Sequence, residues 1–347
     1  MDKYGLTYIT INRDHLLHNA RYFKNKSGKK LIAVIKSNAY GHGMLEVAQI
    51  LNDEADCYAV DSLDYALSLR EHGFTKPILI LNPIDLNYLD LVLENDLMIT
   101  VSSLSDLQNI VPDTNKLKLQ IKVDTGMNRF GIKCKQELDE MIQYIKTKNW
   151  QLVGIYTHYH SPNNEVYSKH QQKRFLEMLQ NIEHDFTYVH LCSTSAVLND
   201  LDLPETTHVR VGLGLYGICD SPEVKPVLSL YSKIVLKKNV SAEETVGYGA
   251  NYQAKEDMWI GVLPCGYADG IIRHNTNRKV YIDGHYTEII GNVCMNALMI
   301  KLPHPDVKGD VELIGEHVSA LEIARHLNTI SYEVTTILPF HLKRIII

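Results

Sequence analysis

Short hydrophobic runs recur along the first two thirds of the chain, each separated from the next by helical or turn-rich sequence. This pattern is typical of buried parallel strands joined by helices. The runs lie at residues 33–35, 58–60, 78–81, 98–101, 117–123, 152–156, 188–192 and 209–213. About eight repeats predict an α/β fold, a closed (β/α)8 barrel of the TIM type.

A doubly wound open sheet is the alternative arrangement of alternating strands and helices. Such a sheet often carries G-x-G-x-x-G after its first strand, and none follows residues 33–35. Ahead of the first run, residues 6–11 predict a strand and residues 12–23 a helix, which Asn12 can cap. The barrel is therefore the favoured prediction.

The hydrophobic pattern changes near residue 227. Short alternating runs at residues 232–236, 258–264, 279–282 and 298–300 are separated by Gly and Asn turns. They predict a second, mostly β domain. We expect a barrel domain at residues 1–226 and a β-rich domain at residues 227–347.

Composition narrows the class of partner. The chain has 347 residues, 45% hydrophobic and 22% charged, and a formal charge of -6 gives no basic footprint for nucleic acid. No apolar stretch reaches transmembrane length and the first residues lack a signal pattern, so we expect a cytoplasmic protein without a membrane partner. Six cysteines without C-x-x-C spacing and sixteen histidines without H-E-x-x-H indicate neither a disulfide framework nor a metal site.

Lys36 follows the first run and precedes the turn-rich sequence SNAYGHG. Ligands bind at the carboxyl ends of barrel strands, and a lysine held there against apolar walls loses its charge easily and can form an imine with a carbonyl compound. A surface lysine that closes a strand is the alternative. The position between a buried run and a turn makes Lys36 a candidate catalytic residue.

Residues capable of chemistry also follow the later runs. They are Lys122, Asp124 and Arg129 after the fifth, Thr157 and His158 after the sixth, Ser193, Thr194 and Ser195 after the seventh, and Arg210, Gly212 and Gly214 at the eighth. Each has a purely structural explanation, such as an ion pair, a core histidine or a helix cap. Together they suggest a phosphate site opposite a lysine, and hence pyridoxal phosphate or a phosphosugar Schiff base.

Seven segments make the chain similar to the alanine racemases, which are fold-type III pyridoxal 5′-phosphate enzymes. In order and spacing these are AVIKSNAYGHG, KVDTGMNRFG, GIYTH, RVGLGLYG, VGYGAN, GYADG and NVCMN. The resemblance covers nearly the whole chain. It implies a homodimer with shared active sites, in which Lys36 carries the cofactor and Tyr248 of the partner subunit faces it.

The resemblance also implies the remaining site residues. Arg210 would meet the pyridine nitrogen, His158 would lie against the ring, and Tyr40, Thr194 and Gly212 would approach the phosphate. Arg129 would bind the substrate carboxylate, held by Lys122, which is carbamylated in many relatives. Met295 would line the substrate site from the other chain. The implied reaction is interconversion of L- and D-alanine, whether for D-alanine biosynthesis as a peptidoglycan precursor or for catabolism.

The chemistry of racemisation explains why the resemblance implies two acid/base residues. The reaction removes the α-proton from one face of a planar carbanion and returns a proton to the other, so it needs acid/base groups on opposite faces. Lys36 and Tyr248 can supply them. Arg210 cannot donate its proton at neutral pH, so it would leave the pyridine nitrogen unprotonated and restrain side reactions such as transamination.

The chain departs from the family at residues that bear on substrate choice. Ser193-Thr194 stands where the family usually has Asn-Ser, Asn296 where it has Asp, and Phe340 where it has Tyr. Such changes in a pocket can admit serine or a larger amino acid. Alanine is the expected substrate, and a serine or broader racemase is the alternative.

Two other hypotheses concern proteins of the same fold type. A decarboxylase would need an acidic residue at the cofactor's nitrogen, and Arg210 argues against it. A non-catalytic pyridoxal phosphate carrier would have a single domain. The β-rich segment after residue 227 and the VGYGAN motif argue against the carrier.

Overall fold

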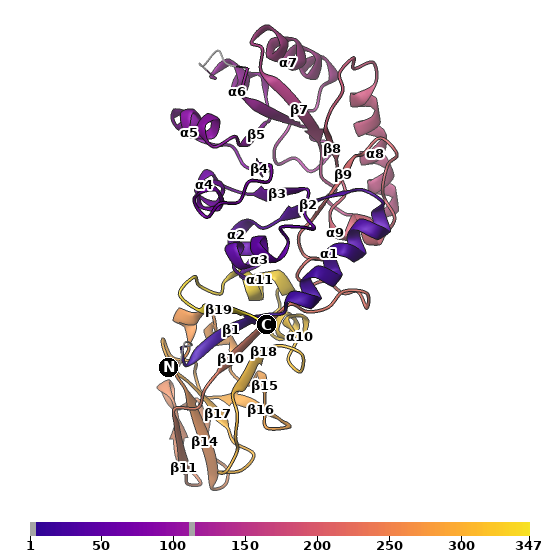
Figure 1. Cartoon of the computed structure of the whole chain (residues 1–347). Coiled ribbons are helices and arrows are strands. Elements are labelled where there is room, and N and C mark those ends of the chain that lie inside the picture. The colour runs from indigo at the N-terminus through magenta and orange to yellow at the C-terminus, as the bar shows by residue number, and fades with distance from the viewer. Residues whose placement is uncertain (1–4, 111–114) are drawn as a thin grey trace. The chain divides into compact units, whose positions relative to one another are not determined.

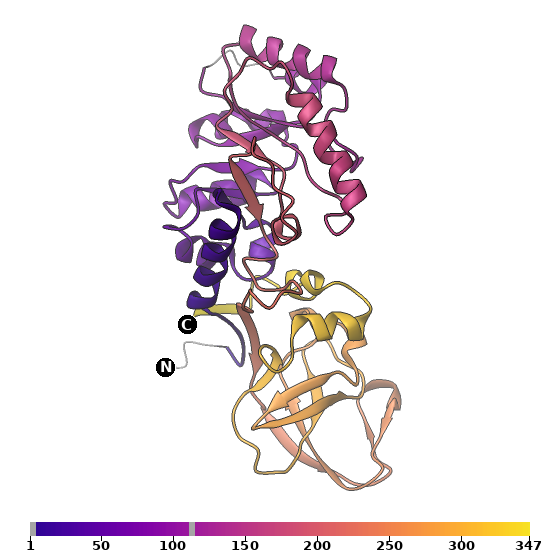
Figure 2. The ribbon, with the colours of Figure 1, turned by 90° about the vertical axis from the view of Figure 1, so that its right-hand side faces the viewer.

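The computed structural model describes residues 5–110 and 115–347. The chain forms two compact units, seen as ribbons in Figures 1 and 2. We call Leu17–Ser37 with Ala48–Leu215 the barrel unit, and Met1–Leu16 with Asn38–Val47 and Tyr216–Ile347 the sheet unit. Within the described ranges, no helix combines the length and apolar character needed to cross a bilayer.

Eight parallel strands form the centre of the barrel unit, and every predicted run contributes one. They are β2 (Lys30–Val34), β3 (Cys57–Val60), β4 (Ile78–Ile80), β5 (Met98–Val101), β6 (Lys118–Lys122), β7 (Gln151–Tyr156), β8 (Tyr188–His190) and β9 (His208–Val211). They pair in the order β8-β7-β6-β5-β4-β3-β2-β9. The N–H of Thr207 donates to Val189 O at 2.8 Å and that of Arg210 to Cys192 O at 2.9 Å, so the barrel is nearly closed between β8 and β9.

Helices alternate with these strands, which confirms the α/β prediction. They are α1 (Arg13–Ser27), α4 (Leu63–Glu71), the short η1 (Leu86–Tyr88), α5 (Leu89–Glu94), α6 (Leu104–Gln108), α7 (Lys135–Thr147), α8 (Glu165–Leu179) and α9 (Thr194–Leu198). Asn12 caps α1 as predicted, because its Oδ1 accepts a hydrogen bond from the His15 N–H at 2.9 Å. Strands β3, β4 and β5 are buried along their whole length, which explains their unbroken apolar runs.

The sheet unit is mostly β, as predicted. Its main sheet has the order β11-β14-β17-β16-β15-β18-β10-β1-β19. Its strands are β1 (Thr7–Ile11), β10 (Leu228–Ser232), β11 (Leu236–Val240), β14 (Met258–Leu263), β15 (Lys279–Ile282), β16 (His285–Ile290), β17 (Leu298–Lys301), β18 (Val311–Ile314) and β19 (Lys343–Ile346). Strand β1 lies between antiparallel β10 and parallel β19, so the start of the chain joins this sheet.

Smaller elements complete the sheet unit. They are α3 (Met44–Ile50), which continues into the barrel unit, the hairpin of β12 (Thr245–Val246) and β13 (Tyr252–Gln253), the 3₁₀ turns η2 (Tyr248–Ala250), η3 (Tyr267–Asp269) and η4 (Arg273–Asn275), and helices α10 (Ala320–Leu327) and α11 (Ser331–Thr336). The hairpin packs on a small apolar cluster that includes Val240, Val246, Ile260 and Met299.

Candidate active site

Lys36 lies two residues after the end of β2 and begins α2 (Lys36–Tyr40). The next four residues have φ between +51° and +55°, so α2 is a left-handed helical turn. This conformation costs a non-glycine residue about 1–2 kcal/mol. A run of four therefore persists only because the surrounding structure holds it, and such strain is typical of functional sites.

The environment of Lys36 lowers the pKa of its amine. Burial is the largest cause that lowers its pKa, and the positive charges of Arg129 and Arg210 lower it further, while Asp61 acts in the opposite direction. Asp61 also accepts a hydrogen bond from the Ser37 N–H at 3.3 Å. An amine that loses its proton easily can attack a carbonyl carbon and can later accept a proton.

Arg210, on β9, is almost fully buried at the centre of the site. Its Nη2 donates to Thr157 O at 2.6 Å and to His158 Nδ1 at 3.1 Å, and its Nη1 donates to His190 O at 3.1 Å and to His190 Nδ1. Among the described residues, the Nε–H of Arg210 has no hydrogen-bond partner. The guanidinium is thus fixed by the barrel and keeps one donor for a ligand.

A buried amide fixes the tautomer of His190. Gln120 Oε1 lies 2.8 Å from His190 Nε2, and an amide oxygen can only accept, so Nε2 carries the proton. The Nδ1 lone pair then accepts from Arg210. Burial, and next the charge of Arg210, hold the pKa of His190 well below its usual range. A neutral His190 can therefore support the arginine without repelling it.

The ring of Tyr156 packs against His190, Arg210 and Lys122. Its ring stacks on His190 with centroids 4.7 Å apart, and its hydroxyl bonds Thr100 Oγ1 at 2.8 Å. Arg210 Cζ lies 5.0 Å and Lys122 Nζ 4.5 Å from the ring centroid. A tyrosine face attracts cations, so it offsets part of their repulsion in this confined space.

Lys122 lies at the end of β6 and is buried. Burial is the largest cause that lowers its pKa well below the usual range, followed by the charges of Arg210 and Arg129. Four basic groups, Lys36, Lys122, Arg129 and Arg210, interact here, and among the described residues the carboxylates of Asp61 and Asp124 act against them. Such a site favours anionic ligands.

The loops after β6 and β7 are joined by Gln171 of α8, which is fully buried. Its Nε2 donates to Thr125 Oγ1 and to the carbonyl of His158, both at 3.0 Å, and its Oε1 accepts from the His160 N–H at 3.1 Å. These bonds hold the loop of His158. Burial, and next the charge of Arg210, keep the pKa of His158 well below its usual range, so it presents a neutral ring.

The start of α9 adjoins the loop after β9. Thr194, the first residue of α9, accepts a hydrogen bond at Oγ1 from the Gly214 N–H at 3.0 Å. A Cβ on Gly214 would lie 2.2 Å from Phe23 Cε2, so only glycine permits this approach. The hydroxyls and N–H groups of this region suit a phosphate.

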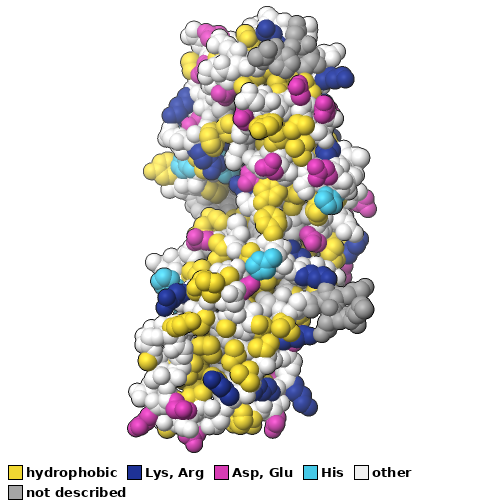
Figure 3. All heavy atoms as spheres, turned by 90° about the vertical axis from the view of Figure 1, so that its left-hand side faces the viewer, with side chains coloured by type: hydrophobic (Ala, Val, Ile, Leu, Met, Phe, Trp, Pro, Cys, Tyr) yellow, Lys and Arg dark blue, Asp and Glu magenta, His cyan; other side chains and the backbone are white. Residues whose placement is uncertain are grey.

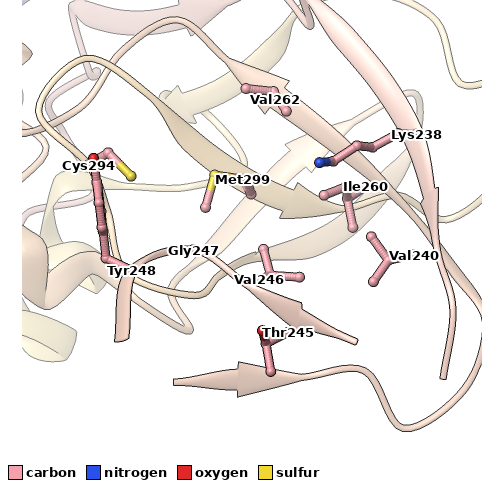
Figure 4. A pocket seen from close by; sticks show the side chains of 10 residues that line it. All are labelled: Lys238, Val240, Thr245, Val246, Gly247, Tyr248, Ile260, Val262, Cys294 and Met299. Atoms are coloured by element: carbon pink, nitrogen blue, oxygen red, sulfur yellow. The ribbon is translucent and has the colours of Figure 1, made fainter. Parts of the chain in front are cut away.

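Other predicted site residues belong to the sheet unit. The side chains of Tyr248 and Met295 are exposed, with 72% and 55% of their area accessible. The Tyr248 carbonyl accepts from Asn292 Nδ2 at 2.6 Å. A cavity of about 440 Å³ lies beside Tyr248, lined by Val246, Met299, Cys294 and neighbouring residues (Figure 4). Tyr40 lies against Tyr216, with ring centroids 5.2 Å apart.

Pyridoxal 5′-phosphate needs an amine for its aldehyde, a partner for its pyridine nitrogen and donors for its phosphate. The barrel unit offers Lys36, the open Nε–H of Arg210 and the Thr194 region, each at the carboxyl end of a different strand. The residues present therefore fit this group. Fold and site define a pyridoxal phosphate-dependent enzyme built on a (β/α)8 barrel.

Known proteins agree with this class. Residues 11–220 match the family "Alanine racemase, N-terminal domain" and residues 227–346 match "Alanine racemase, C-terminal domain". The chain belongs to the alanine racemase family. It is 38% identical to an alanine racemase of Streptococcus uberis over 92% of this chain and 91% of that protein, and 36% identical to one of Lactococcus lactis subsp. cremoris over 90% and 89%.

Solved structures give the same picture. The chain resembles the alanine racemase of E. faecalis with a TM-score of 0.93 and 33% identity, covering 98% of both chains. It also resembles a histidine racemase from Leuconostoc mesenteroides subsp. sake, with a TM-score of 0.92 and 26% identity, covering 99% of both chains. The family is a pyridoxal phosphate-dependent racemase family, and this chain is a racemase of that type.

The structure thus brings Lys36, Lys122, His158, Arg210 and Thr194 to the carboxyl ends of the barrel strands. Sequence reasoning missed four supporting residues, which are Asp61, Gln120, Gln171 and His190. Polar residues inside otherwise apolar strands, as in KLQIK and YVHL, are the signal that could have identified Gln120 and His190. Nothing local distinguishes Gln171, because its partners lie in other segments.

Proposed function

We propose that this chain interconverts L- and D-alanine, with Lys36 and the partner subunit's Tyr248 as the two acid/base groups. The main support for this proposal is the placement of Lys36 and Arg210 at the carboxyl ends of barrel strands. Lys36 has a lowered pKa, and Arg210 keeps one N–H that can donate to a ligand. When bound, pyridoxal phosphate withdraws electrons from the substrate's α-carbon. Every other step depends on the side chains of the protein.

Lys36 Nζ would hold the cofactor and then exchange the α-proton on one face of the substrate. Because burial lowers the pKa of Lys36, its amine releases its proton more easily, and the neutral amine can accept the α-proton. Tyr248 Oη would exchange the proton on the other face. Arg210 would keep the pyridine nitrogen unprotonated through its Nε–H, because an arginine does not release its proton at neutral pH.

The remaining site residues would bind and orient. Arg129 would pair with the substrate carboxylate, His158 would lie against the cofactor ring, and Tyr40, Thr194 and Gly212 would contact the phosphate. Met295 of the partner subunit would line the substrate site. The excess of basic groups beside Lys36 supports two anionic ligands in this region.

We propose that Lys122 is carbamylated. A buried amine with a lowered pKa attacks the carbon of CO₂, forms an N–C bond and releases one proton. The product is a carbamate anion, which turns repulsion from Arg129 and Arg210 into attraction. This charge reversal explains why a lysine is buried among cations. Mass spectrometry of protein kept under CO₂ tests the modification.

We also propose a cytoplasmic homodimer with shared active sites. Tyr248 and Met295 are largely exposed within one chain, and hydrophobic side chains gather on the surface of the sheet unit in the lower part of Figure 3. Residues that serve a partner's site need this exposure. All six cysteines are free thiols, which supports a reducing compartment.

A broader racemase is the second candidate, because Phe340 lacks a hydroxyl and Asn296 lacks a charge that the family usually has. The histidine racemase of Leuconostoc shows that the fold serves a larger substrate as well. One experiment tests both functions: a panel of L-amino acids is incubated with protein and pyridoxal phosphate, and the products are separated by chiral chromatography. D-alanine as the main product supports the proposal, D-serine or D-histidine supports the second candidate, and no D-product contradicts both.

A further inference from the structure

Gly41 directly follows the left-handed turn α2 and also has positive φ, at +85°. Bonds inside the segment hold part of the turn. The His42 N–H donates to Ala39 O at 3.0 Å, the Gly43 N–H to Asn38 O at 2.9 Å, and the Met44 N–H to Asn38 Oδ1 at 2.8 Å. The carbonyl of Gly41 makes a different contact, with a residue 303 positions later.

That residue is Arg344, on the edge strand β19. Its Nε and Nη2 both donate to Gly41 O, at 3.0 and 2.9 Å. Its Nη1 donates to the carbonyls of Leu342 at 2.7 Å and Pro339 at 3.2 Å. One planar fork therefore ties the end of the turn to the segment that carries Phe340.

Close packing leaves no room for a side chain at Gly41 or Gly43. A Cβ on Gly41 would lie 1.9 Å from Thr335 O, and one on Gly43 would lie 2.6 Å from Arg344 Cδ. The guanidinium is partly buried against these atoms. An ammonium group cannot reproduce the two parallel bonds to Gly41, because lysine presents a compact charge and not a planar fork.

We propose that Arg344 is a positioning residue for the cofactor site. It acts through the turn: by holding Gly41 O, it keeps the strained segment that begins with Lys36 and contains Tyr40 in its left-handed form. This inference rests on the proposed function, in which Lys36 and Tyr40 bind pyridoxal phosphate. Arg344 itself would touch neither substrate nor cofactor.

The first test needs no cofactor. Amide hydrogen exchange is measured in the peptide covering residues 37–44 of Arg344→Lys apoprotein, with the β10 and β18 peptides as an internal reference. Arg278→Lys is the matched control, because Arg278 is a buried arginine of the same unit whose Nη1 donates to Leu313 O at 2.6 Å. We expect exchange in residues 37–44 to be faster by about tenfold or more only in the Arg344 variant.

The second test measures binding of pyridoxal phosphate to the apoproteins by absorbance titration. The dissociation constant should rise by about tenfold or more in Arg344→Lys and stay near the wild-type value in Arg278→Lys. Arg344→Met should behave like Arg344→Lys or worse. Thermal unfolding of each variant shows whether the substitutions at Arg344 and at Arg278 lower the stability of the protein by comparable amounts.

Unchanged exchange in residues 37–44, or an equal increase in both arginine variants, would overturn the positioning role. Faster exchange with unchanged cofactor affinity would show that Arg344 holds the turn, but it would overturn the claim that the turn positions the cofactor site. Failure of the wild-type protein to bind pyridoxal phosphate or to racemise alanine would instead contradict the proposed function. In that case the exchange result still decides whether Arg344 holds the turn.

Discussion

The two units present their site residues in opposite ways. In the barrel unit, Arg210, Gln120 and His190 are buried and their polar atoms are bonded to one another. In the sheet unit, the residues Tyr248 and Phe340 are exposed, with 72% and 67% of their area accessible. The barrel unit therefore presents a buried group of polar side chains that are bonded to one another, whereas the sheet unit presents its aromatic side chains on the surface.

This contrast explains which chemistry each unit can contribute. Burial lowers the pKa of Lys36 and fixes neutral histidines, so the barrel unit controls charge. An exposed tyrosine can contribute a hydroxyl whose position is set by its backbone and by whatever covers it. We therefore expect substitutions in the buried group and substitutions in the exposed group to have separate effects.

Replacing Lys36 by alanine has the largest expected effect. The change removes both the covalent attachment of the cofactor and one acid/base group, so racemisation should fall by at least about 10⁴-fold. Borohydride reduction of the wild-type protein should fix the cofactor on Lys36, and peptide mapping locates it. Lys30→Ala, at the exposed start of the same strand, is the control. Labelling of another lysine would rule out the assignment.

Tyr248→Phe should follow, with a loss of about 10² to 10⁴-fold in turnover. The variant keeps the ring and deletes one proton-bearing atom, so folding and cofactor binding should survive. Tyr252→Phe is the control, since its hydroxyl contacts only Met258 Sδ, at 3.5 Å, among the described residues. In heavy water under single-turnover conditions, exchange of the α-hydrogen of L-alanine should slow selectively.

A second measurement tests whether Tyr248 acts in the active site of the partner subunit. Inactive Lys36→Ala and Tyr248→Phe chains are mixed, dissociated and reassociated. One hybrid site then holds both wild-type groups, so activity should reappear. If no activity returns although mixed dimers form, the exposed tyrosine does not serve a partner's barrel. Turnover and exchange at wild-type levels in Tyr248→Phe alone would require another base.

Gln120→Leu tests the buried network. It leaves the Nε2–H of His190 without a partner, and an unpaired buried donor costs about 1–3 kcal/mol. Urea unfolding should show this loss, whereas ¹⁵N NMR should show that His190 keeps its proton on Nε2, because Arg210 still donates to Nδ1. Gln143→Leu, on the exposed side of α7, should change neither. A changed tautomer would mean that the bond from Arg210 is not sufficient to fix His190.

The smallest expected effect concerns pH. Burial lowers the pKa of His208 to about 4, from about 6.5 in the unfolded chain. Between these values the unfolded state binds one more proton, so the free energy of unfolding falls as the pH falls, by up to about 1.4 kcal/mol per pH unit. His208→Asn should reduce that slope between pH 6.5 and 4.5, and exposed His170→Asn should not. Equal slopes in all three proteins would contradict the shift.

Local patterns predicted much of this molecule. All eight barrel strands were visible as apolar runs, because strands buried on both sides need uniform hydrophobicity. Lys36 stood out because a charged residue ended such a run. The change of pattern near residue 227 still supports the proposed boundary between residues 1–226 and 227–347.

Other features depend on contacts distant in sequence. No local signal places β1 between β10 and β19, since that pairing joins the two ends of the chain. The segment SNAY contains no glycine, so nothing in it predicts four residues with positive φ. Arg344 stabilises this segment from more than 300 residues away, and no pattern reveals such a bond.

The placement of β1 has a consequence for synthesis. Ribosomes release β1 long before β10 and β19, which are its neighbours in the finished sheet. At roughly 5–20 residues per second, more than about ten seconds separate the first strand from β10. Ile9 and Ile11 are fully buried once the sheet is complete, so nascent chains must shield these side chains in the meantime. We therefore expect the yield of this protein to depend on chaperones that cover exposed apolar segments during synthesis.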